Sequence, residues 1–136
     1  MKPIISRVFL LALLFAVGSC NYVSEKMSED LPTIGTEALA AGLVAKQLFV
    51  FDNNTPAIFK QNHIPSAVHM DPRNADVSLL PADKGAKLVF YCKNTWCMAS
   101  HAGARFAIDQ GYKNSSVYAE GIDGWIEAGK PVESGI

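Results

Sequence analysis

Short continuous apolar runs alternate with longer alanine- and leucine-rich segments along most of this chain. Short apolar runs are typical of parallel strands buried on both faces, whereas the longer segments favour helices. A first, short strand is predicted to begin near Leu31. Four more strands are predicted over Gln47–Asp52, Ala67–Met70, Leu88–Tyr91 and Ser116–Ala119. Helices are predicted over Gly35–Ala45, Thr55–Gln61, Ser100–Gln110 and Ile122–Ala128.

Residues with known preferences for helix ends support these boundaries. Thr55 followed by Pro56 predicts an N-cap and the first helical position, and Ser100 and Gly111 are predicted as the N-cap and C′ residues of the longest helix. Residues 71–87 read as a loop with one helical turn. Strands that alternate with helices favour an α/β domain whose central, mainly parallel, five-stranded sheet is flanked by helices.

The N-terminus departs from this pattern, because the basic segment Met1–Arg7 precedes the unbroken apolar run Val8–Val17. Such a run is too short for a permanent membrane span and is typical of a secretory signal. Val17-Gly18-Ser19-Cys20 resembles the bacterial lipobox. We therefore expect a lipoprotein signal peptide over residues 1–19, a lipidated Cys20 and a polar tether over residues 20–30. An ordinary signal peptide or a plain membrane anchor is the alternative.

The N-terminal sequence predicts where the protein is located, and the charge of the chain argues against one class of partner. Asn21 after the cysteine favours an extracytoplasmic domain that is lipid-anchored to the outer membrane on its periplasmic side. Lys2 and Arg7 are two of 12 basic residues, so the mature chain carries 10 against 13 acidic residues and has no basic run. Nucleic-acid binding therefore lacks electrostatic support. Residues 31–136 are long enough for one domain, which we expect to be monomeric and to need no cofactor.

The candidate chemistry lies at Cys92, which directly follows the predicted strand Leu88–Tyr91. A loop and the start of a helix come next, so Cys92 lies at the sheet edge where α/β folds bind ligands. Loop amides and a helix N-terminus favour the thiolate, which makes a cysteine nucleophilic. The alternative is a buried structural cysteine that only ends a core strand.

Five landmarks in chain order resemble those of the rhodanese-like (sulfurtransferase) family. They are Asp52, His63-Ile64-Pro65-Ser66-Ala67, Tyr91-Cys92, Gly111-Tyr112-Lys113-Asn114 with Val117-Tyr118, and Gly121-Ile122-Asp123-Gly124-Trp125 with Ala128-Gly129-Lys130-Pro131-Val132. The resemblance implies a three-layer domain in which Cys92 takes sulfur from a small donor as a persulfide and passes it to a thiol or protein acceptor. It also implies that Asp52 braces the active-site loop, whose residues are Lys93, Asn94, Thr95, Trp96, Cys97, Met98, Ala99 and Ser100.

The loop departs from the family pattern in charge and length. No arginine occupies it, and the family's Asp-x-Arg is here Asp52-Asn53-Asn54. Two groups that would hold an anionic donor such as thiosulfate are therefore missing, and Lys93 is the nearest cation that could replace part of their charge. The extra length contains Trp96, which could line or cover the pocket or simply fill a gap, and Cys97.

Several readings stay open for the groups beside Cys92. Cys97 could form a disulfide with Cys92, resolve its persulfide, or have no role. His101 could support the thiolate, and both cysteines with His101 could ligate a metal, although three candidate ligands do not complete a zinc site and no metal is expected. Two alternatives to a sulfurtransferase follow, namely a thiol–disulfide redox module and a non-catalytic binding domain of the same fold.

Overall fold

The computed structural model describes residues 30–136. The predicted signal peptide, Cys20 and nearly all of the predicted tether lie outside the described residues. Residues Leu31–Ile136 form a compact unit. Within the described part of the chain, no helix combines the length and the apolar character needed to cross a membrane.

Four parallel strands form the central sheet, in the order β2-β1-β3-β4. They are β1 (Phe49–Asp52), β2 (Val68–His69), β3 (Leu88–Tyr91) and β4 (Ser115–Tyr118). The predicted boundaries of β3 are confirmed, and the other strands lie within about one or two residues of their predicted positions, as is usual for strand ends. In β3, all four residues are buried, as a central parallel strand requires.

The prediction of a fifth strand near Leu31 is wrong. Thr33 makes an isolated parallel bridge with Val117, and the adjoining bonds are Ile34 N–H to the Val117 carbonyl (3.0 Å) and Val117 N–H to the Pro32 carbonyl (2.8 Å). Pro32 has no N–H to donate, so it cannot extend a ladder. This segment therefore only touches the outer edge of β4.

Within residues 30–136, four helices surround the sheet. They are α2 (Thr36–Val44), α3 (Pro56–Gln61), α4 (Ala99–Asp109) and α5 (Gly121–Glu127), and two short 3₁₀ turns, η1 (Pro72–Asn74) and η2 (Val77–Leu79), replace the single predicted turn. The predicted cap of α3 is confirmed, because the Thr55 hydroxyl accepts a bond from Ile58 N–H at 3.5 Å. Gly111 has φ +97°, which explains why glycine follows the end of α4.

Ser100 does not cap α4, contrary to the prediction. The helix begins at Ala99, and Met98 occupies the cap position without a side-chain bond. Ser100 is instead buried in the first turn, with its Oγ 3.4 Å from Sγ of Cys92. Its hydroxyl therefore contacts the cysteine sulfur and does not cap the helix.

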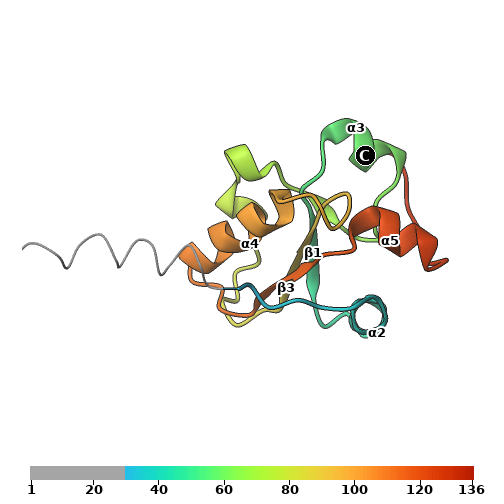
Figure 1. The fold of residues 1–136 in the computed structure, drawn as a ribbon. Helices are drawn as coiled ribbons and strands as arrows, with labels where there is room; N and C mark the ends of the chain where they lie inside the picture. Colours follow the sequence, from blue (N-terminus) through green and yellow to red (C-terminus); the bar gives the residue numbers. More distant parts are fainter. Residues whose placement is uncertain (1–29) are drawn as a thin grey trace, which may run out of the picture. The chain divides into compact units, whose positions relative to one another are not determined.

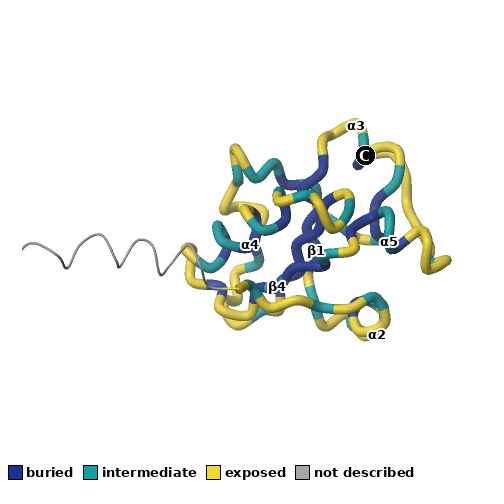
Figure 2. The backbone as a smooth tube through the Cα atoms, in the orientation of Figure 1, coloured by how far each residue is buried: buried dark blue, intermediate teal, exposed yellow. Residues whose placement is uncertain are grey.

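The domain has three layers, with α4 on one face of the sheet and α2 and α5 on the other (Figure 1). Side chains alternate along the strands, so Phe90 packs in the cluster beneath α4, while Val89 and Tyr91 pack with Trp125 of α5. The deepest burial follows the strands between these helices (Figure 2). This double-sided core holds the end of β3 rigidly and so determines where Cys92 lies.

Candidate active site

Cys92 lies at the carboxyl end of β3 with only 2% of its surface exposed. Its Sγ is 3.4 Å from Ser100 Oγ, in the first turn of α4, and 3.1 Å from the Cys97 carbonyl oxygen. The first-turn N–H groups of a helix have no partner within the helix, and its dipole stabilises negative charge there. The helix N-terminus therefore favours a thiolate at this position, whereas the Cys97 carbonyl oxygen opposes one.

Cys97 forms a disulfide with Cys92. Their Cα atoms are 6.2 Å apart, within the range that a disulfide spans. Cys97 precedes α4, and its N–H donates to the Asn94 carbonyl at 3.0 Å, so the loop turns back toward β3. Of the three predicted roles of Cys97, the structure contains the disulfide.

The N-terminus of α5 holds the first half of the loop. Ile122 N–H donates to the Cys92 carbonyl at 2.9 Å, and Asp123 N–H donates to the Lys93 carbonyl at 3.0 Å. Gly121 has φ +64°, and a Cβ there would lie 2.5 Å from the Cys92 and Lys93 carbonyl oxygens. Glycine at this position therefore allows α5 to approach the backbone that carries the nucleophile.

Asp123 of the same helix pairs with the loop's lysine. The Lys93 ammonium lies 2.8 Å from Asp123 Oδ1, and Asn94 Nδ2 donates to Asp123 Oδ2 at 3.2 Å. The bond from Lys93 is the main reason that the pKa of Asp123 is lowered. The ammonium is already paired, so an anionic donor would have to share it with the Asp123 carboxylate.

The tip of the loop is exposed. Trp96 is 91% exposed and Met98 is 63% exposed, so Trp96 neither covers the cysteine nor fills a gap in this structure. Thr95 is exposed as well, and Ala99 is half-buried. His101 is half-buried in the first turn of α4, and its Nδ1 is buried without a hydrogen-bond partner among the described residues. The loop tip thus presents two large apolar side chains, Trp96 and Met98, to solvent.

Asp52 is fully buried at the end of β1, the strand that pairs with β3. Its Oδ1 accepts a bond from Asn54 N–H at 2.7 Å, and Asn53 N–H donates to the Tyr91 carbonyl at 2.8 Å. Burial raises the pKa of Asp52, partly opposed by the Tyr91 hydroxyl and the Asn54 amide. These bonds connect Asp52 to the residue immediately before Cys92, which is compatible with the bracing role that the resemblance implies.

We expect Asp52 to make the stability of the domain fall as pH rises. A raised pKa means that the folded state binds more protons than the unfolded state above the ordinary value of 3.8. The free energy of unfolding therefore declines from about pH 4 upward through the folded pKa. Asp52→Asn keeps an oxygen for Asn54 N–H and removes this titration. Urea unfolding at several pH values should show a flatter dependence in the variant, and parallel curves would contradict the expectation.

A metal centre has no ligand set within residues 30–136. No cluster of three or more His, Cys, Asp or Glu side chains there is arranged to hold an ion. The disulfide also engages Cys92 and Cys97, two of the three ligands considered from the sequence.

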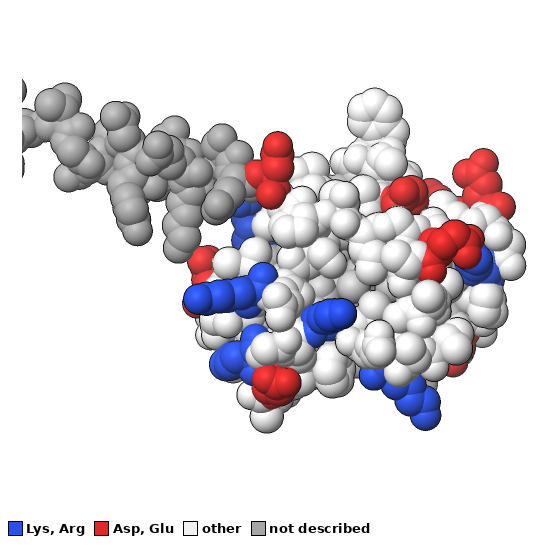
Figure 3. Space-filling model, turned by 90° about the horizontal axis from the view of Figure 1, so that it is seen from below, with Lys and Arg blue, Asp and Glu red and all other residues white. Residues whose placement is uncertain are grey.

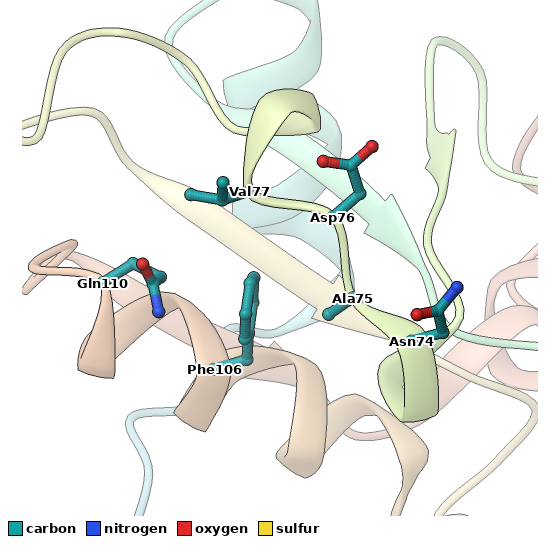
Figure 4. Close-up of a pocket in the computed structure, with 6 residues that line it drawn as sticks. All are labelled: Asn74, Ala75, Asp76, Val77, Phe106 and Gln110. Atoms are coloured by element: carbon teal, nitrogen blue, oxygen red, sulfur yellow. The ribbon is translucent and has the colours of Figure 1, made fainter.

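A shallow cavity of about 450 Å³ lies elsewhere, between α4 and the two 3₁₀ turns (Figure 4). It is lined by Asn74, Ala75, Asp76, Val77, Phe106 and Gln110. None of these was a predicted site residue, and no motif in the sequence indicated the cavity. Its lining carries one carboxylate and no nucleophile.

The surface shows no concentration of charge on the face in Figure 3, where acidic and basic side chains are mixed. Lys130 and Glu37 form one surface ion pair, at 2.8 Å. The absence of a basic run in the sequence remains the argument against a nucleic-acid partner.

Comparison with known proteins identifies relatives of the whole arrangement. The rhodanese-like domain model matches residues 36–128, which is more than half of the chain. A rhodanese-related protein from Thermoplasma volcanium is 23% identical, with a TM-score of 0.63 over 75% of this chain and 97% of its own. The human single-domain sulfurtransferase is 20% identical, with a TM-score of 0.60 over 72% of this chain and 97% of its own.

A third solved structure is of a much longer chain, of which only a part matches. The thiosulfate sulfurtransferase from Pseudomonas aeruginosa is 21% identical, with a TM-score of 0.66 over 83% of this chain but only 21% of its own. No curated protein gives a significant match. At these identities the solved structures support the fold, and the chemistry must be argued from this chain's own residues.

Proposed function

Because the chain belongs to the rhodanese-like domain family, we propose that it is a sulfurtransferase or sulfur carrier that holds sulfur as a persulfide on Cys92. The observation that carries the proposal is the position of Cys92 Sγ, between the end of β3 and the first turn of α4. A helix N-terminus beside a cysteine favours its thiolate form. Reduction of the disulfide with Cys97 releases that thiolate for reaction.

The proposed reaction has two displacements at sulfur. The Cys92 thiolate attacks the outer sulfur of a donor, so a new sulfur–sulfur bond forms while the donor's own bond breaks, and the rest of the donor leaves with the electron pair. An acceptor thiolate then attacks the outer sulfur of the persulfide and releases the Cys92 thiolate. The Ser100 hydroxyl, 3.4 Å from Sγ, and the start of α4 stabilise the negative charge at each stage.

The preferred donor is a thiol hydropersulfide and not thiosulfate. Thiosulfate is a dianion, and the loop offers it only Lys93, whose ammonium is already paired with Asp123. Neither Asn53 nor Asn54 carries a charge to compensate. A hydropersulfide has less charge to neutralise, and its organic part could rest on the exposed Trp96 and Met98.

We expect the reduced Cys97→Ser variant to gain the mass of one sulfur atom when it is incubated with cysteine hydropersulfide. Cys97 is absent, so the persulfide on Cys92 has no internal thiol to react with. Thiosulfate should load the variant at least about tenfold more slowly, because a lost charge-assisted bond costs about 1.5–3 kcal/mol. Intact-mass spectrometry follows both reactions.

The matched control is the double variant with Cys92→Ser and Cys97→Ser, which should gain no mass. Equal loading of the control, or no loading of the single variant by either donor, would contradict a persulfide on Cys92. A non-catalytic binding domain would then be the better reading of this fold.

A second candidate function is a thiol–disulfide redox module, which the Cys92–Cys97 disulfide specifically favours. Such a module exchanges its disulfide with a dithiol substrate through a mixed disulfide. It requires that mild oxidation removes two hydrogens from the reduced protein. Two thiols that stay freely alkylatable after oxidant treatment would exclude it, whereas sulfur loading is not needed for it.

We further propose that the domain works outside the cytoplasm, tethered by a lipidated Cys20. The support is the basic N-terminus, the apolar run Val8–Val17 and the lipobox-like Val17-Gly18-Ser19-Cys20. Stable anchoring needs more than one acyl chain, as lipidation at such a cysteine supplies. Labelling with a fatty acid in a bacterial host should mark the protein, and Cys20→Ala should lose both the label and the membrane fraction. Labelling that survives in Cys20→Ala would refute the anchor.

A further inference from the structure

We propose that Cys97 is a second catalytic residue, which resolves the persulfide on Cys92 and releases its outer sulfur as hydrosulfide. The inference rests on the proposed persulfide and states what happens to its outer sulfur. The domain would then be a dithiol-driven reductase of sulfane sulfur, and not only a carrier that waits for an external acceptor.

The position of Cys97 determines which sulfur atom it attacks. The two Sγ atoms are in bonding contact across Cα atoms 6.2 Å apart, so Cys97 reaches the inner sulfur of a persulfide on Cys92. An external thiol must instead approach a residue that is 2% exposed. The chain therefore holds the internal thiol next to the inner sulfur, whereas an external acceptor must reach it by diffusion.

The backbones of the two cysteines are bonded to different parts of the fold. This difference suits a pair in which one thiol carries the sulfur and the other displaces it. The Cys92 carbonyl accepts a bond from Ile122 N–H of α5, so the nucleophile is fixed to a distant part of the fold. The backbone bond from Cys97 N–H is local, to Asn94 at 3.0 Å, within a loop whose tip is exposed. Cys97 can thus withdraw when the disulfide is reduced and return after Cys92 has received sulfur.

The step balances without an outside oxidant. The Cys97 thiolate attacks Cys92 Sγ, the Cys92–Cys97 bond forms, and the bond between Sγ and the outer sulfur breaks. The outer sulfur leaves with that electron pair and takes a proton, so persulfide plus thiol becomes disulfide plus hydrogen sulfide. The cysteines are oxidised by two electrons and the transferred sulfur is reduced by two. A dithiol reductant must restore both thiols before the next cycle.

A single-turnover experiment tests this inference. The wild-type protein and the Cys97→Ser and Cys97→Ala variants are reduced, freed of reductant and mixed with a limiting amount of cysteine hydropersulfide. The wild type should release hydrogen sulfide stoichiometrically and finish two hydrogens lighter than the dithiol. Both variants should hold the extra sulfur and release at least about tenfold less sulfide, because they lack the attacking thiol. The double variant with Cys92→Ser and Cys97→Ser lacks both loop thiols and measures the sulfide that the donor releases by itself.

The outcomes separate this inference from the proposed function. If the wild type keeps the extra sulfur as long as Cys97→Ser does, Cys97 does not resolve the persulfide, although Cys92 still carries sulfur. If neither Cys97 variant takes up sulfur, the persulfide proposal itself fails and this inference fails with it. Agreement between the serine and alanine variants excludes an effect of the new hydroxyl.

Discussion

Cys92→Ser should lower the rate of sulfur transfer from a hydropersulfide to a thiol by at least about a thousandfold. A serine hydroxyl stays protonated at neutral pH, so neither the start of α4 nor Ser100 can convert it into a comparable nucleophile. The substitution changes one atom in a residue that is 2% exposed, so the fold should persist. A colorimetric assay of transfer under excess dithiol measures the effect.

Cys97→Ser is the matched comparison for this prediction, because it removes the other half of the disulfide. With excess external thiol it should keep sulfur uptake, since uptake requires only Cys92. If Cys97→Ser abolished uptake while Cys92→Ser retained it, the attacking cysteine would have been assigned to the wrong side of the loop. Unchanged transfer in Cys92→Ser would overturn the proposed function.

Gly121→Ala should destabilise the domain by about 2–5 kcal/mol. A left-handed conformation costs a non-glycine residue about 1–2 kcal/mol, and forcing a methyl group into packed atoms typically adds about 1–3 kcal/mol. At Gly121 both apply, because φ is +64° and the new Cβ would lie 2.5 Å from backbone atoms of Cys92 and Lys93. Urea unfolding measures the loss, and sulfur uptake should slow because the loop must shift.

Gly129→Ala provides the control for the backbone conformation. Gly129 has φ +69°, close to that of Gly121, but a Cβ there would meet nothing within 4 Å. This variant should lose about 1–2 kcal/mol and keep its rate of sulfur uptake. The difference between the two variants measures the contact between α5 and the loop. Equal losses, with equal uptake, would show that this contact does not position Cys92.

Local patterns were sufficient to predict much of this fold. The apolar run Leu88–Tyr91 is buried on both sides in the structure, so its boundaries could be found from hydrophobicity alone. Thr55-Pro56 and Gly111 mark helix ends because capping and positive φ are properties of a few neighbouring residues. The five landmarks then indicated the family, which the match to residues 36–128 confirms.

Predictions from the sequence were wrong where contacts between residues far apart in the chain determine the structure. Ser100 suits a helix cap by residue type, yet the structure turns it toward Cys92. The segment near Leu31 suits a strand, but within residues 30–136 its backbone bridges only to the outer edge of β4, and Pro32 removes a donor. Lys93 was predicted to be the nearest cation for an anionic sulfur donor. In the structure it pairs with Asp123, thirty positions later in the chain.

The sequence by itself determined the order of strands and helices, the family and the cysteine at the end of the central strand, because periodicity and spacing are local properties. Only the tertiary structure decided how the loop is arranged around that cysteine. The Cys92–Cys97 disulfide depends on how the loop turns, and the pairing of Lys93 and the approach of Gly121 depend on where α5 packs. These contacts join separated parts of the chain, and no local pattern encodes the distances between them.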